Sequence, residues 1–545
     1  MLSVSQTEQK GPHPRVLRSV SVVSLMTAVS RVLGLVREVT MAYFFGTSAL
    51  KSAFDIAFIV PNLFRRLFGE GALSSAFVPV FGETLIREGH ASAFRFGMRV
   101  ISMLTVVLGF ITTAGILLSF PLARMLPPES RWLIPLPMLR VMLPYALLIC
   151  IAALLSGMLN TLGKFAIASL TPFLLNLIWI VTLLVVCPFV FRAPEQQIQT
   201  LSWAILLAGL AQILFQLPAL GRHGFRFRLR FRGMFHDPGV KRVLYLMGPA
   251  SLGIGLIQIN VCIDKVLAFW ADPAAPAALE YAERLIYLPL GVFGTAFMTV
   301  LLPTFSRQAS AGELPAMQAT LERSLRNLSV IMAPCSAALF VLALPVILLV
   351  YSFRGGRFDE TSALLSARAL AAYAPGLLVF SFQKAITPAF YGLQDLRTPV
   401  RVSLCALVLN ITLNVFSVLW LPHGWKHVGI AGSTVLTSLV NAVALVILLR
   451  RRTVAPRREA VIPTLLKAVG CSLVMAVGVW RVCTVGMRWA DGLGEYVKGA
   501  QIGVMALTVL CGVILYGGLM VWVGRGAVWE MVGEFRRRPV KGVRQ

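Results

Sequence analysis

Four arginines lie inside long apolar runs of this sequence, where a charged side chain is costly. They are Arg31 and Arg37 in SRVLGLVREV, Arg65 in PNLFRRLFGEG and Arg284 in AERLIYLP. A charge at the centre of a bilayer costs about 2.5 to 3.5 kcal/mol on insertion scales, so four would cost on the order of 10 kcal/mol. The guanidinium fork matches phosphate bidentately and stays protonated in a low-dielectric site. The pattern indicates a binding site for a phosphate-bearing anion.

Acids in the same runs offer a purely structural alternative, in which they neutralise the arginines. The candidates are Glu38, Asp55, Glu70, Asp264, Glu280 and Glu283. Helical neighbours in sequence point about 100° apart, so adjacent residues pair poorly, whereas Arg66 can meet Glu70 four residues later. We expect some pairing, but the repeated choice of arginine favours a binding role.

The elements that must position these residues are membrane helices. The chain has 545 residues, of which 57% are hydrophobic and 13% charged. Runs long enough to cross about 30 Å of hydrocarbon recur along it, and they are too long for barrel strands. We predict an all-α polytopic membrane protein with fourteen spans, at residues 18–45, 52–81, 97–122, 133–160, 166–190, 200–220, 243–270, 278–305, 325–352, 362–392, 399–421, 428–449, 461–484 and 499–523.

The net charge of +27 reflects topology rather than nucleic-acid binding. Most of the Lys and Arg outside the spans fall in alternate loops, which the positive-inside rule places in the cytoplasm together with both termini. The loop GFRFRLRFRGMF (224–235) sets topology or, alternatively, lies at the interface, attracted to anionic lipid. The eight cysteines are scattered and the six histidines fall in loops, so we expect no resident metal of zinc type.

An internal repeat relates the first six spans to the next six. RVL at 15–17 recurs at 242–244, and FDIAFIVP (54–61) aligns with AERLIYLP (282–289) with proline in register. An even number of spans per unit makes the halves parallel, and such transporters bind substrate between them. We therefore predict two six-helix bundles around a central cavity on which the four arginines converge.

The motifs SRVLGLVREV, FDIAFIVPNLFRRLFGEGALSSAFVPVF and YAERLIYLPLGVFGTAFMTVLLP closely resemble the MurJ (MviN) family. These are lipid II flippases of bacterial cell-wall synthesis within the multidrug/oligosaccharidyl-lipid/polysaccharide exporter superfamily. The resemblance covers essentially the whole chain. Two positions depart from some relatives, which carry an acid where Tyr287 stands and a small polar residue where Ala277 stands.

The resemblance implies a non-enzymatic, monomeric transporter in the bacterial inner membrane. Its partners would be lipid II, with its polyprenyl tail, and membrane lipids. Essential cavity arginines would be Arg31, Arg37, Arg65 and Arg284, supported by Glu38, Asp55, Asn62, Arg66, Glu70 and Glu283. The expected division is an N-lobe at 1–222, a basic linker at 223–242, a C-lobe at 243–452, two helices forming a lipid-tail groove at 453–524 and a basic tail at 525–545.

Alternating access needs an asymmetric energy source, either sodium or the membrane potential. Asn410 and Asn414 share a helix face, and with Asp264 they could supply hard oxygen ligands to sodium. In the alternative, Asp264 pairs with a cavity arginine and the asparagines bond between helices.

Two other function classes remain at this stage. A drug or small-molecule antiporter of the same superfamily should have a net acidic cavity, whereas cations are prominent here. A membrane-embedded transferase acting on lipid-linked sugars would need a metal-type acid motif in a long loop, and the sequence shows no DxD motif in such a loop.

Overall fold

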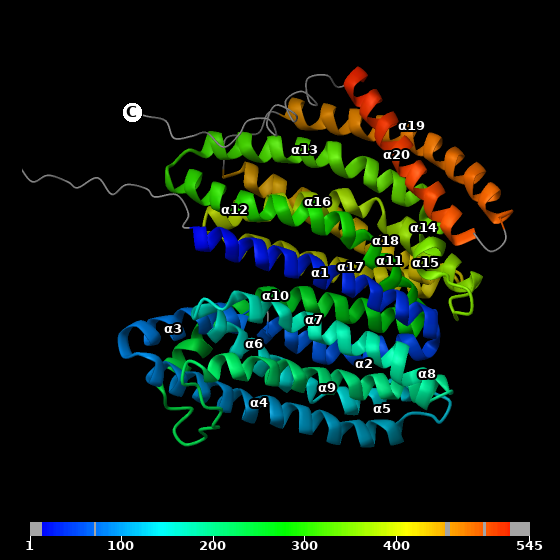
Figure 1. Ribbon diagram of the computed structural model, residues 1–545. Helices are drawn as coiled ribbons and strands as arrows, with labels where there is room; N and C mark the ends of the chain where they lie inside the picture. The colour runs from blue at the N-terminus through cyan, green and yellow to red at the C-terminus, as the bar shows by residue number, and fades with distance from the viewer. Residues whose placement is uncertain (1–13, 70–71, 453–457, 494–496, 524–545) are drawn as a thin grey trace, which may run out of the picture. The chain divides into compact units, whose positions relative to one another are not determined.

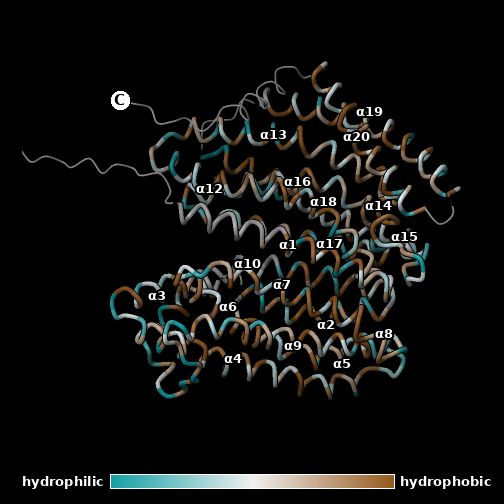
Figure 2. Tube along the Cα trace, viewed as in Figure 1, coloured by the Kyte–Doolittle hydropathy of each residue, from teal (hydrophilic) through white to brown (hydrophobic). Residues whose placement is uncertain are grey.

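The computed structural model describes residues 14–69, 72–452, 458–493 and 497–523, and every regular element in these ranges is a helix (Figure 1). In hydrocarbon no water satisfies backbone N–H and C=O groups, and a helix satisfies them internally. Figure 2 shows apolar residues along the helices of the chain. The predicted all-α class is confirmed.

The chain divides into two compact units, and unit 1 comprises Met1–Phe45 and Ala49–Gln258. Its helices are α1 (Pro14–Phe45), α2 (Ala49–Phe64), α3 (Ala72–Glu88), α4 (His90–Met125), α5 (Pro135–Met142), α6 (Tyr145–Thr161), α7 (Phe165–Val181), α8 (Cys187–Val190), α9 (Pro194–Gly221) and the first part of α10 (Pro238–Ala271). Two π-helical segments, η1 (Arg65–Gly69) and η3 (Thr182–Val186), and one 3₁₀ turn, η2 (Arg131–Leu133), interrupt them.

Unit 2 comprises Gly46–Ser48 and Ile259–Gln545. After the end of α10 it contains α11 (Ala275–Pro289), the π-helical η4 (Leu290–Gly294), α12 (Thr295–Ser310), α13 (Leu314–Val341), α14 (Ala343–Tyr351), α15 (Glu360–Tyr373), α16 (Gly376–Gly392), α17 (Arg397–Trp420), α18 (Lys426–Arg450), α19 (Arg458–Asp491) and α20 (Val497–Val523).

The predicted spans coincide with these helices. Each of the fourteen lies on one helix or on a succession of shorter helices, separated by turns at residues 143–144, 342 and 374–375. Among the described residues, 9 helices are long and apolar enough to cross a membrane, and 11 if each of two bent helix pairs is one span. The remaining three predicted spans lie on α1, on α2 to α3 and on α10, which also carry many of the ionisable residues singled out above.

Two irregularities occur at corresponding places in the two sets of six spans. In the second span of each set, a proline precedes a π-helical segment: Pro61 precedes η1, and Pro289 precedes η4. In the fourth span of each set, two helices meet at a bend, of 41° between α5 and α6 and of 46° between α15 and α16. Shared irregularities at shared positions support the duplication that the sequence indicates.

Small residues allow close helix packing inside unit 1, as is common between membrane helices. A methyl group on Gly209 of α9 would lie 2.8 Å from the ring of Tyr145 on α6, which is closer than real carbon contacts. Tyr145 is fully buried, and its ring packs 6.1 Å from that of Phe58 on α2. The contact therefore fixes α9, α6 and α2 against one another.

A tight turn at Gly46 is built into unit 2. Gly46 has φ +55°, a left-handed conformation that favours glycine. The Tyr281 hydroxyl donates to the Gly46 carbonyl at 2.9 Å, and the Thr47 hydroxyl donates to Ser362 Oγ at 2.9 Å. A Cβ at position 46 would overlap the carbonyl oxygen of Arg357.

We expect Gly46→Ala to destabilise the chain more than Gly163→Ala. Gly163 also has a positive φ, of +73°, but nothing lies within 4 Å of its Cβ position. The Gly163 change should therefore cost about 1 kcal/mol through the backbone alone, and the Gly46 change about 2 kcal/mol more through overpacking. Apparent unfolding temperatures in detergent measure both variants. Equal shifts would show that the turn tolerates the extra methyl group.

Candidate functional site

The stretch PNLFRRLFGEG carries its arginines at the change from α-helix to π-helix. The Arg65 Nε donates to Asn62 Oδ1 at 3.0 Å, which uses one edge of the guanidinium. Arg66 Nη1 donates to Gln258 Oε1 on α10 at 3.3 Å. Arg65 is half-buried, and π-helical bulges are frequent at functional sites. The predicted pairing of Arg66 with Glu70 involves a residue outside the described ranges.

Arg37 lies in a clamp between α1 and α7. Its Nη2 donates to Glu38 Oε1 at 2.6 Å, its Nη1 donates to Asn176 Oδ1 at 3.1 Å, and its Cζ lies 4.5 Å from the centroid of the Trp179 ring. The side chain is only 11% exposed. Cation–π attraction and charge-assisted hydrogen bonds reinforce each other in such a desolvated place. Contrary to the expectation that adjacent helical residues pair poorly, Arg37 and Glu38 form an ion pair here.

One buried donor of Arg37 has no acceptor. Its Nε is buried and makes no hydrogen bond among the described residues, while Asn176 Nδ2 donates to the carbonyl of Ser30 at 3.3 Å. Asn176 and Trp179 were missed from the sequence, where an apolar run containing one amide and one indole carries no distinctive signal.

Asp55 forms a buried ion pair with Lys51, four residues earlier on α2. Lys51 Nζ lies 2.6 Å from both carboxylate oxygens. Lys51 is 1% exposed and Asp55 6%. The expected apolar run began at residue 52, so Lys51 was not considered, although its i,i+4 spacing to Asp55 is a readable signal. Removing either partner would leave an uncompensated buried charge.

In unit 2, Glu280 links two cations. Lys265 Nζ lies 2.7 Å from Glu280 Oε2, and Arg284 Nη2 lies 3.8 Å from Glu280 Oε1. The Arg284 side chain is 38% exposed. Glu283 is half-buried, Tyr287 is exposed and Ala277 is fully buried. The Arg284 side chain is therefore partly open to its surroundings.

Asp264, Asn410 and Asn414 come together as the sequence predicts. Asn414 Nδ2 donates to Asp264 Oδ1 at 2.6 Å and lies 2.9 Å from Asn410 Oδ1. Asn410 and Asn414 are buried. Hydrogen bonds thus join α10 to α17 and, through Asn410 and Thr437 at 3.4 Å, α17 to α18.

Further oxygen donors surround this cluster. Asn260 Nδ2 donates to Asp264 Oδ2 at 3.3 Å, and the Thr434 hydroxyl approaches the same oxygen at 3.5 Å. The amide oxygens of Asn260 and Asn414 are buried without a hydrogen-bond partner among the described residues. Asn260 and Thr434 were missed, because amides and hydroxyls are ordinary in membrane helices. Within the same residues, no group of three or more His, Cys, Asp and Glu could hold a metal ion.

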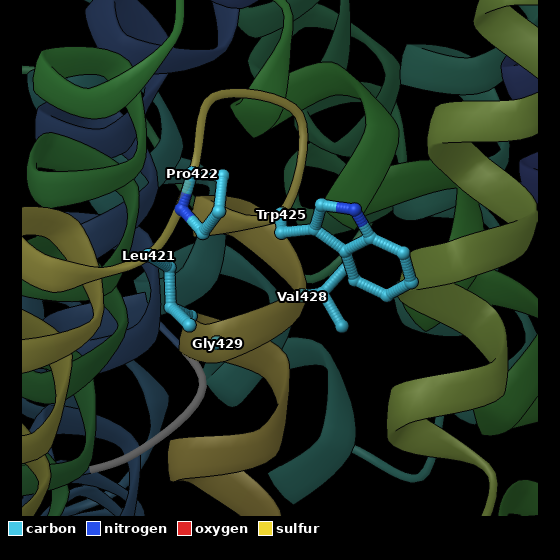
Figure 3. Close-up of a pocket in the computed structure, with 5 residues that line it drawn as sticks. All are labelled: Leu421, Pro422, Trp425, Val428 and Gly429. Atoms are coloured by element: carbon cyan, nitrogen blue, oxygen red, sulfur yellow. The ribbon is translucent and has the colours of Figure 1, made fainter.

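The four predicted arginines are distributed over both units. Arg31, Arg37 and Arg65 lie in unit 1 and Arg284 in unit 2, and Arg31 is exposed. Their convergence on one cavity stays a prediction. A separate surface hollow of about 420 Å³ lies at the turn between α17 and α18 (Figure 3). Its lining is Leu421, Pro422, Trp425, Val428 and Gly429, none of which belongs to the predicted site.

Known proteins resemble the chain over most of its length. The family model described as "Lipid II flippase MurJ" matches residues 41–494. A protein of Burkholderia cenocepacia named "Lipid II flippase MurJ" is 31% identical over 93% of this chain and 97% of its own. A protein of Buchnera aphidicola named "Probable lipid II flippase MurJ" is 32% identical over 88% of this chain and 94% of its own length.

Solved structures show the same fold. The structure "Lipid II flippase MurJ, inward closed conformation" has a TM-score of 0.74 at 22% identity and covers 93% of this chain and 99% of its own. An inward-facing transporter of the MATE family has a TM-score of 0.63 at 14% identity and covers 80% and 98%. Because a family model matches most of the chain and relatives align along nearly their whole length, the chain belongs to the lipid II flippase MurJ family.

Proposed function

We propose that this chain is a transporter that carries lipid II, the lipid-linked peptidoglycan precursor, from the cytoplasmic to the outer leaflet of the bacterial inner membrane by alternating access. Membership of the flippase family is the observation that carries the proposal. The intramembrane arginines supply the matching chemistry, because the substrate has a diphosphate that needs cations in a wet cavity.

The arginines divide into two roles in this proposal. Arg65 and Arg284 are the diphosphate ligands, because Arg65 is half-buried in a π-helical segment and the Arg284 side chain is 38% exposed. Arg31 joins them as an exposed ligand. Arg37 is held on three sides by α1 and α7 and acts mainly by positioning the wall of the cavity.

The polyprenyl tail of the substrate needs an apolar surface apart from the arginines. The C-terminal helices α19 and α20 share an apolar cluster with α13, built around Met475, Val479 and Met520. In the proposal, residues 453–524 form the groove that holds the polyprenyl tail, beside lobes at 1–222 and 243–452 that are joined by the basic segment 223–242. The protein works as a monomer with both termini in the cytoplasm.

The energy source in this proposal is sodium, with the membrane potential as the alternative. Asp264, Asn410 and Asn414, supplemented by Asn260 and Thr434, would hold the ion. The two unpartnered amide oxygens fit hard-oxygen ligation, because a buried acceptor without a donor is costly. When bound, the ion supplies a positive charge beside Asp264.

We expect Arg65→Ala and Arg284→Ala to slow the flipping of labelled lipid II in proteoliposomes by about thirtyfold each, corresponding to a lost charge-assisted bond of about 2 kcal/mol. Lysine at either position should restore only part of the flipping rate, because a point charge lacks the bidentate fork of the guanidinium. Arg368→Ala is the control, since Arg368 stacks over Trp425 at 5.0 Å beside the α17–α18 turn. Undiminished transport by the first two variants would remove the proposed ligands.

The positioning role of Arg37 predicts coupling to Trp179. In a double-mutant cycle of Arg37→Gln and Trp179→Leu, we expect a coupling free energy of about 1 kcal/mol in unfolding stability, from the lost cation–π contact. A parallel cycle with Trp203→Leu, a residue 57% exposed on α9, should give no coupling. If the effects of the Arg37 and Trp179 changes on unfolding stability were additive, the stacking of the two side chains would contribute nothing to that stability.

Sodium binding predicts ion-specific stabilisation. At ten times its dissociation constant, sodium should stabilise the purified chain by about 1.4 kcal/mol relative to equal potassium or choline. Asp264→Asn and Asn414→Leu should each abolish the difference in apparent unfolding temperature. Stabilisation that is the same for all three cations would leave the membrane potential as the energy source.

A further inference from the structure

The segment Phe225–Arg232, FRFRLRFR, alternates apolar and basic residues between two helices, and we call it the arginine strip. It follows the end of α9 at Gly221 and precedes the start of α10 at Pro238. Residues 225–231 form neither helix nor turn. In an extended chain, alternate side chains point to opposite faces, so such a sequence has one basic and one apolar edge.

Residues 226–232 of the arginine strip are exposed. Its four arginines, Arg226, Arg228, Arg230 and Arg232, are all exposed. The apolar residues between them are exposed as well: Phe227 at 41%, Leu229 at 39% and Phe231 at 51%. Loops in water rarely present a regular series of large apolar side chains, so this edge fits a partly apolar environment.

The arginine strip is nevertheless fixed to the bundle at several points. Phe225 is buried and packs edge-to-face on Phe94 of α4, with ring centroids 5.4 Å apart. The amide of Arg230 donates to the buried Ser102 Oγ of α4 at 2.7 Å. Just beyond the strip, Met234 is buried and Asp237 pairs with Arg99 of α4.

These anchors set the level of the arginine strip relative to the membrane. Helices α9 and α4 are both candidate spans, and the strip lies where α9 ends and α4 begins (Figure 1). A segment held against the ends of two spans lies near the lipid headgroups. Amphipathic segments bury their apolar side chains about 5 to 10 Å into that boundary.

The charge of the arginine strip is not used inside the protein. No ion pair of its four arginines occurs among the described residues, where the nearby acid Glu83 pairs with Arg87 and Arg242. Lys241 at the start of α10 and Arg95 on α4, both exposed, add to the positive field. Such a surface attracts anions, and clustered basic residues beside a membrane favour anionic lipids.

We propose that the arginine strip is an interfacial anchor that binds anionic phospholipid headgroups, with Phe227, Leu229 and Phe231 inserted between the lipids. Charge complementarity and the position between span ends identify the partner as the bilayer surface itself. A soluble polyanion would leave the apolar edge in water. The anchor is independent of transport, so its failure would leave the proposed flipping of lipid II untouched.

Hydrogen–deuterium exchange of the full chain in nanodiscs tests this anchor directly. We expect the backbone of residues 225–232 to exchange at least tenfold more slowly in discs of equal phosphatidylglycerol and phosphatidylcholine than in discs of phosphatidylcholine alone. High salt should reverse the protection in the unaltered chain, because it screens the headgroup charge. Equal exchange in the two lipids would overturn the proposal without any variant.

Matched variants separate the arginine strip from total charge. Changing Arg226, Arg228, Arg230 and Arg232 to Gln should abolish the lipid-dependent protection. The control changes four other exposed arginines to Gln: Arg307, Arg397, Arg401 and Arg451. The control should keep the full protection, and unchanged exchange in α4 and α9 verifies folding of both. Equal loss of protection in both variants would assign the effect to net charge. Stronger protection by added heparin in phosphatidylcholine discs would assign it to a soluble polyanion. Either result overturns the proposal.

Discussion

An ionised group inside an apolar helix must find its compensation within the protein, because hydrocarbon offers no water and a bare charge costs several kcal/mol. The interactions inside these helices follow from this constraint. Lys51 meets Asp55, Glu280 lies between Lys265 and Arg284, and further along the chain buried amides close around a single carboxylate. The pairs Lys265–Glu280 and Asp264–Asn414 also join α10 to α11 and α17, so at these places charge compensation and helix packing depend on the same contacts.

The degree of compensation distinguishes a structural cation from a binding one. Arg37 is held by a carboxylate, an amide and an indole, and replacing those partners with a ligand would first require breaking them. The Arg284 side chain is 38% exposed, and its Nη2 lies 3.8 Å from Glu280, an acid that it shares with Lys265. In the proposed function, a diphosphate would reach Arg284 more readily than Arg37, which would first have to give up the partners that hold it.

The sequence was sufficient for the fold class and the positions of the helices, because an apolar run of about 20 residues has few alternatives to a membrane helix. The spacing of four residues also placed the amides of Asn410 and Asn414 on one helix face, whereas the contact of Asp264 with Asn414 depends on the packing of α10 against α17. The contact of Arg66 with Gln258 could not be predicted from the sequence, because the two residues are 192 positions apart and only tertiary packing joins them. Convergence of the arginines and the division into lobes depend on the arrangement of whole helices, which spacing within one helix does not determine.

The π-helical segment η4 has a consequence for α12, the helix that follows it. A π turn accommodates one residue more than an α turn, and one residue corresponds to a rotation of about 100°. The register of α12 against its neighbours is therefore set by the length of the five-residue segment Leu290–Gly294, which passes directly into it. Loss of one residue there would restore a regular helix and at the same time turn the whole of α12, so a deletion in this segment disturbs more of the bundle than a substitution.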